Sequence, residues 1–223
     1  MNSPTRSLIA KEFHQHRWLL LSSIGGGLAG LAVAGIEGLM YFNIGMLTWL
    51  TTFVAFGVVL AMFGISNERK ERALLFVLSL PLSHADYVRT KLLGLLLCYL
   101  VPWMVLTTGA VLLILARPNL PDGLLPEAIL LCGFMLANFT LVLCGALSTR
   151  SEGLMTVIVI VTNMGVTLFI FLLAAIPAIA EHMREATPAW SREFWIVLAA
   201  EAAVLLTACS IPYFAASRRR DFI

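Results

Sequence analysis

The stretch NERKERALLFVLSLPLSHADYVRTK, from Asn67 to Lys91, contains eight charged residues and separates two long apolar runs. A helix needs about 20 apolar residues to cross the core of a bilayer, and both neighbouring runs are long enough. The 223-residue chain is 60% hydrophobic and 13% charged, whereas soluble domains are typically about 45–50% apolar and about 25% charged. The composition therefore predicts a multi-span membrane protein.

Six apolar segments reach the length of a membrane span. The length of the chain suits one compact domain and leaves no room for a separate soluble one, so we expect a single all-α integral membrane domain over residues 1–223. The expected spans are Trp18–Met40, Met46–Ile65, Leu92–Ala116, Ala128–Leu147, Gly153–Ile179 and Phe194–Ala216.

The basic residues predict how these spans are oriented. Of the 15 Lys and Arg residues, 12 fall in the termini and connections of one side, and three, Arg117, Arg184 and Arg192, fall on the other. Cytoplasmic connections carry an excess of Lys and Arg, so both termini and the stretch quoted above are expected in the cytoplasm. Two cytoplasmic termini require an even number of spans, and six satisfies this requirement. Aromatic residues such as Trp49 are expected to mark the outer interface.

The charged stretch itself is expected to form a short, rigid helix that ends in a bend. Asn67 can cap a helix with Glu68 in its first turn, and Glu68 and Arg72 have the spacing of a helical ion pair. The apolar block Ala73–Leu80 is too short to span a bilayer and must bury its surface elsewhere. Pro81 ends the helix because it lacks a backbone N–H.

Two uses of this charged hairpin are open. A stiff hairpin is suited to dock a cytoplasmic partner and to transmit a push into the adjoining spans. Alternatively, Arg69, Lys70 and Arg72 bind anionic lipid headgroups and anchor the loop at the membrane. The residue pattern alone favours neither use.

Two further segments are expected to lie along the membrane. In residues 1–17, Leu8, Ile9 and Phe13 share one helical face, with basic residues elsewhere, which is typical of a short interfacial helix. Residues 177–193 are mildly amphipathic and extracytoplasmic in the predicted topology, and an ordinary surface loop is an equal alternative.

Three polar residues lie inside the expected spans. Glu201 is the acidic residue placed well within a span, and such a residue suggests a functional site. It is either a contact in a transport pathway or a protonated carboxyl bonded to a neighbouring helix. Asn138 and Asn163 are the other candidates for the pathway, and interhelical hydrogen bonds are their alternative role.

The sequence contains no sign of catalysis. It lacks the Walker A motif, so we expect no ATP to bind to this chain in that way. Its four histidines form no recognised catalytic or metal motif, and its four cysteines lie singly in apolar stretches. We therefore expect no catalytic residue, metal site or cofactor. The net charge of +2 is too small to suggest a nucleic-acid partner.

The order of the segments and one motif carry a family resemblance. A basic amphipathic N-terminal segment and two spans precede ERKERALLFVLSLPLSHADYVRTKLL, and four spans follow it. This arrangement resembles the membrane subunit of type-2 ABC transporters, the ABC-2-like permeases of bacterial exporters. The motif residues that match are Glu68, Arg69, Glu71, Leu75, Leu78, Ser79, Leu80, Pro81, Leu82, Ser83, Lys91, Leu92 and Leu93.

The resemblance implies a role for each segment. Residues 1–17 would be an elbow helix, and residues 66–91 would form the cytoplasmic coupling helix between spans two and three. The coupling residues would contact a separate ABC ATPase, present in two copies, which binds ATP and Mg²⁺. A second, identical permease and the lipid of a bacterial cytoplasmic membrane would complete the assembly. The coupling residues implied are Glu68, Arg69, Lys70, Glu71, Arg72, Leu75 and Pro81.

The expected function is therefore export of an amphipathic compound, a peptide or a lipid-like molecule. One alternative is a membrane scaffold or sensor partner that transports nothing. A second alternative is a secondary transporter, which should show internal repeats and intramembrane charge pairs. Glu201 as a lone intramembrane acid argues against that alternative.

Overall fold

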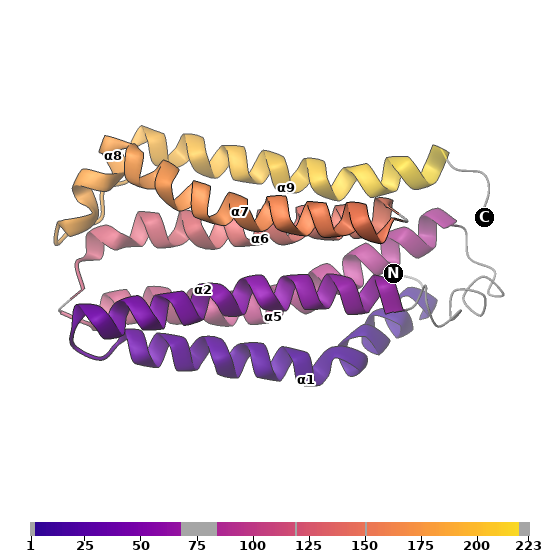
Figure 1. Ribbon diagram of the computed structural model, residues 1–223, viewed down its shortest axis with the longest axis horizontal. Helices are drawn as coiled ribbons and strands as arrows, with labels where there is room; N and C mark the ends of the chain where they lie inside the picture. Colours follow the sequence, from indigo (N-terminus) through magenta and orange to yellow (C-terminus); the bar gives the residue numbers. More distant parts are fainter. Residues whose placement is uncertain (1–2, 68–83, 119, 150, 219–223) are drawn as a thin grey trace.

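The computed structural model describes residues 3–67, 84–118, 120–149 and 151–218. These residues form a bundle of long antiparallel helices (Figure 1), without a β-strand among them. Six of the helices are long and apolar enough to cross a membrane. The prediction of an all-α protein with six spans is confirmed.

Short helical turns adjoin several of the spanning helices. A π-helical turn, η1 (Met62–Asn67), extends α2, and η2 (Asp122–Leu124), α8 (Pro177–Ala180) and η3 (Glu181–Arg184) lie between longer helices. The long helices are α1 (Ser3–Ala34), α2 (Leu39–Ala61), α5 (His84–Ala116), α6 (Leu125–Ser148), α7 (Glu152–Ala175) and α9 (Arg192–Arg218).

Several predicted span ends differ from the structure, and three of them lie at turns. The first span ends at Ala34 rather than Met40, and the second begins at Leu39 rather than Met46. Gly38 lies between them with φ 122°, a conformation that glycine adopts without steric cost, so the chain reverses earlier than hydropathy suggests. The fifth span ends at Ala175 because Ile176, which precedes Pro177, is extended.

The N-terminal segment continues into the first span without a break. Residues 3–17 belong to α1, which is one helix from Ser3 to Ala34, and Figure 1 shows this helix changing direction in its N-terminal part. The position of this part along the membrane surface stays a prediction. The coupling residues fall within 68–83, outside the described residues, and α5 begins directly after them at His84.

The two ends of the bundle separate the connections as the charge pattern predicts. The start of α1, the starts of α5 and α7 and the end of α9 lie at one end of the bundle (Figure 1). The turns that contain Arg117, Arg184 and Arg192 lie at the other end, which we call the outer end. The assignment of the first end to the cytoplasm stays a prediction.

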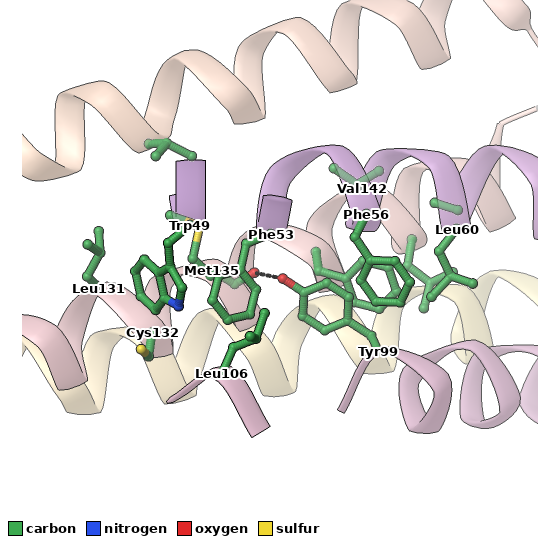
Figure 2. Packing of buried hydrophobic residues seen from close by; sticks show 14 of the residues in the cluster. Trp49, Phe53, Phe56, Leu60, Tyr99, Leu106, Leu131, Cys132, Met135 and Val142 are labelled. Carbon is green, nitrogen blue, oxygen red and sulfur yellow. Dashed lines mark hydrogen bonds between the residues drawn. The ribbon is translucent and has the colours of Figure 1, made fainter. Parts of the chain in front are cut away.

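An aromatic core holds α2, α5 and α6 together (Figure 2). Tyr99 of α5 stacks on Phe139 of α6 at a centroid distance of 3.9 Å and on Phe56 of α2 at 5.6 Å. Its hydroxyl donates to the carbonyl oxygen of Met135 at 3.3 Å. Trp49 is fully buried in this core, so the expectation that it marks the outer interface was wrong.

Candidate functional site

A buried ion pair joins α1 to α5 at the predicted cytoplasmic end. Lys91 Nζ donates to Oε1 of Glu12 at 2.7 Å, and the two side chains are only 4% and 8% exposed. Nε2 of the buried His16 lies 3.6 Å from the other carboxylate oxygen of Glu12. Three titratable groups from two spans therefore share one buried site, and Lys91 is the last residue of the proposed coupling segment 66–91.

The local sequence makes room for this site. Glu12 and His16 are one turn apart on α1, and Glu12 faces α5. On α5, Gly94 follows Lys91 by one turn, and a Cβ at Gly94 would lie 3.1 Å from Cγ of Glu12. Removing one partner of a buried ion pair typically costs about 3–5 kcal/mol because the other charge stays buried without compensation. The pair is therefore a rigid link between two helices that are far apart in sequence.

Glu201 occupies a second buried site at the contact between α9 and α6. The side chain is 7% exposed, and neither carboxylate oxygen has a hydrogen-bond partner among the described residues. A Cβ at Gly133 of α6 would overlap Oε2 of Glu201, so the carboxyl group lies directly against this glycine. The structure thus places Glu201 at a helix interface, where its carboxyl group forms no hydrogen bond with the described residues.

Helix α5 completes the surroundings of Glu201. Thr107 of α5 and Cys132 of α6 are neighbours of each other, and Cys132 is also near the carboxylate of Glu201. The indole Nε1 of Trp103 donates to the carbonyl oxygen of Cys132 at 2.8 Å, which fixes α5 against α6. Such a site can take up a proton or accept a hydrogen bond from a ligand.

The other two candidates for the pathway are not joined to Glu201 by a hydrogen bond. Asn138 is buried on α6. Asn163 on α7 donates its amide to the carbonyl oxygen of Val159 in its own helix at 2.7 Å, and its buried Oδ1 has no partner among the described residues. Among the described residues, the interhelical hydrogen bond expected for Asn163 is therefore not formed.

A groove of about 480 Å³ between α1 and α2 was not predicted. Hydroxyl residues line it among apolar ones, and Thr48 and Thr52 donate to carbonyl oxygens one turn earlier in α2 at 2.8 Å each. Ser22 and Ser23 do the same in α1. The regular spacing of Ser and Thr in these spans was the signal that could have revealed the groove.

The proposed coupling residues cannot be placed in the same way. Glu68, Arg69, Lys70, Glu71, Arg72, Leu75 and Pro81 lie outside the described residues, and their role stays a prediction. Among the described residues, no group of three His, Cys, Asp or Glu side chains is arranged to hold a metal ion.

Comparison with known families gives one match. The family described as ABC-2 family transporter protein matches residues 32–200. This region starts at the end of α1 and reaches into α9, so it includes most of the helical bundle. No curated protein and no solved structure matches the chain significantly.

Proposed function

The chain belongs to the ABC-2 transporter family, and we propose that it is the permease subunit of an ABC exporter. A separate ABC ATPase would bind ATP with Mg²⁺, and the permease would couple hydrolysis to export of an amphipathic compound, a peptide or a lipid-like molecule. Two ATPases and a second, identical permease would complete the transporter in the bacterial cytoplasmic membrane. Both termini of the permease would lie in the cytoplasm.

The buried bond between Glu12 and Lys91 is the observation that carries this mechanism. Residues 68–83, which contain the proposed ATPase contacts, directly precede α5 in the chain. Lys91 lies about two turns into α5, so a displacement at the start of α5 reaches Glu12 and therefore α1. Because separating the two charges is unfavourable, α1 and α5 would move as one rigid unit when the ATPases close.

Glu201 is our candidate for the pathway, together with Asn138 and Asn163. Its carboxyl group is buried and open to a new hydrogen bond, and it lies where α9 meets α6. A relative movement of these helices would expose the carboxyl group to a substrate. The Glu201→Gln substitution keeps the shape of the side chain and removes its ability to take up or release a proton, so it should reduce transport without loss of folding.

Co-purification with an ATPase tests the coupling role. The permease and a candidate ABC ATPase from the same organism are expressed together, and the complex is isolated on a tag carried by the permease. Reversing Glu68 and Glu71 to Lys should abolish co-purification, because the ATPase contacts would meet the opposite charge. Glu152→Lys, at the same predicted end of the bundle, is the matched control and should retain the complex. Retained binding by the double reversal would contradict the assignment of the coupling residues.

A second measurement separates a permease from a membrane scaffold. The purified complex in liposomes is tested for ATP hydrolysis and for movement of amphipathic compounds across the bilayer. A permease should show hydrolysis that depends on the compound and transport that depends on ATP. A complex that binds the ATPase but transports none of the compounds under any nucleotide condition would favour the scaffold.

A further inference from the structure

A cavity of about 300 Å³ lies within one subunit, toward the outer end of the bundle. Five helices contribute to its walls, from Leu31 near the end of α1 to Ile170 near the end of α7. Its volume is at the lower limit for pockets that bind small molecules. We call it the outer-end pocket.

The walls of the outer-end pocket are apolar except for a few groups. Leu113, Leu131 and Trp49 are among the apolar surfaces, and Figure 2 shows Trp49 and Leu131 near each other. The polar groups are Asn43 and Glu127, together with Nε1 of Trp49, which is buried without a hydrogen-bond partner among the described residues. A mainly apolar pocket with a few polar groups is typical of a small-molecule site.

Glu127 carries the charge that such a ligand would meet. It lies in the first turn of α6, where the helix dipole stabilises a negative side chain. In the described part of the chain, no basic residue forms an ion pair with Glu127 and no donor forms a hydrogen bond with it. Glu127 differs in this respect from Glu12, whose charge is compensated directly by Lys91. The oxygens of the Glu127 carboxyl group are therefore open to a cation.

A second cavity adjoins this pocket at the outer end. It has a volume of about 440 Å³ and shares Phe42, Leu120 and Leu124 with the outer-end pocket. Glu37 and Arg117 lie on its lining. A ligand would pass these charged residues first and then place its apolar part between the helices.

We propose that the outer-end pocket binds a small amphipathic organic cation, with its positive group at Glu127 and its apolar part against Trp49 and Leu131. This inference rests on the proposed permease function, because it names the chemical class of the transported molecule. A neutral lipid chain would fill the apolar part but leave Glu127 without a partner. A free metal ion would find only a single carboxylate there.

Equilibrium binding to the permease alone tests this proposal, so that its result does not depend on the ATPase. The full chain is placed in nanodiscs of zwitterionic lipid, and binding of benzyltrimethylammonium is compared with binding of the neutral neopentylbenzene, which has the same shape. The cation should bind more tightly than the neutral compound. Equal binding of the two compounds would overturn the proposal and indicate an apolar site only.

Two variants and a control locate the site. Glu127→Gln should weaken binding of the cation about tenfold or more, because it removes one partner of a partly buried charge pair, and should leave the neutral compound unaffected. Ala128→Phe, which fills the pocket, should abolish binding of both. Glu193→Gln is the control, since Glu193 also lies in the first turn of a helix at the outer end and does not line the pocket.

The outcomes distinguish this proposal from the permease assignment. If Glu127→Gln binds the cation as tightly as the unchanged chain, the site is wrong, whatever the ATPase assays give. If the cation binds as predicted but the ATPase does not co-purify, the pocket stands and the coupling role fails. Thermal unfolding of Ala128→Phe checks that this variant folds. If Ala128→Phe does not fold, binding of the cation to Glu127→Gln still tests the proposal.

Discussion

Replacing Lys91 by Met should strongly destabilise the protein. The substitution keeps a long apolar side chain on α5 and removes the charge that lies 2.7 Å from Glu12. Glu12 would then be left in a site where its side chain is 8% exposed. Breaking a buried pair in this way costs about 3–5 kcal/mol in the free energy of unfolding, and the neighbouring His16 compensates only in part at 3.6 Å.

A double-mutant cycle isolates the interaction from the other contacts of each residue. The free energy of unfolding is measured by circular dichroism during SDS titration in mixed micelles, for the single variants Lys91→Met and Glu12→Gln and for the double variant. The double variant should be more stable than Lys91→Met, because it leaves no unpaired charge. Arg89→Met is the control, since Arg89 is exposed on the same part of α5 and its loss should change the free energy of unfolding by less than about 0.5 kcal/mol.

The same variants test the mechanical role. With the ATPase bound, Glu12→Gln with Lys91→Met should hydrolyse ATP but transport less, because α1 and α5 are no longer tied together by charge. The reasoning is refuted if Lys91→Met unfolds at the same SDS concentration as Arg89→Met. It is equally refuted if the double variant is the least stable of all.

Three further predictions concern packing. Gly45→Ala should destabilise the bundle by about 1–3 kcal/mol, since its methyl group would overlap the backbone of α1. Gly25→Ala, with open space around it, is the control and should be neutral or stabilising in the same SDS titration. Equal effects of the two substitutions would contradict the close crossing of α1 and α2. Gly133→Ala should cost less than Gly45→Ala, because the atom that its methyl group meets is the end of the Glu201 side chain, which can move, rather than backbone. The cost should fall further in a Glu201→Ala background, and an unchanged cost would show that the two residues do not touch. Tyr99→Phe should cost about 1 kcal/mol through the lost hydrogen bond to α6, and thermal unfolding without a shift would exclude that bond.

The number and approximate position of the spans followed from the sequence, because a bilayer imposes one length on every apolar helix. The division of Lys and Arg between the two ends followed for a similar reason, since the membrane sorts charge by side. Where the chain reverses was harder to predict. Residues 35–40 are apolar enough to extend the first span, and Gly38 with its positive φ decides that the helix ends at Ala34.

Contacts between helices required the tertiary structure. Glu12 and Lys91 are 79 positions apart, and no periodic pattern in either segment predicts that these two residues form a pair. Glu201 was recognised as unusual in the sequence, but its position against Gly133 depends on how α9 crosses α6. Trp49 illustrates the same limit, because an aromatic residue near a predicted span end is typical of an interface and here is buried in the core.

The sequence by itself therefore determined that this chain crosses the membrane six times, and only the tertiary structure decided which helices contact one another and where polar groups are enclosed. The physical reason is that hydropathy acts on each segment separately, through its transfer from water to lipid. Helix pairing depends instead on the shapes and hydrogen bonds of two surfaces that meet only in the folded bundle. The outer-end pocket and the buried ion pair both arise from that second set of interactions.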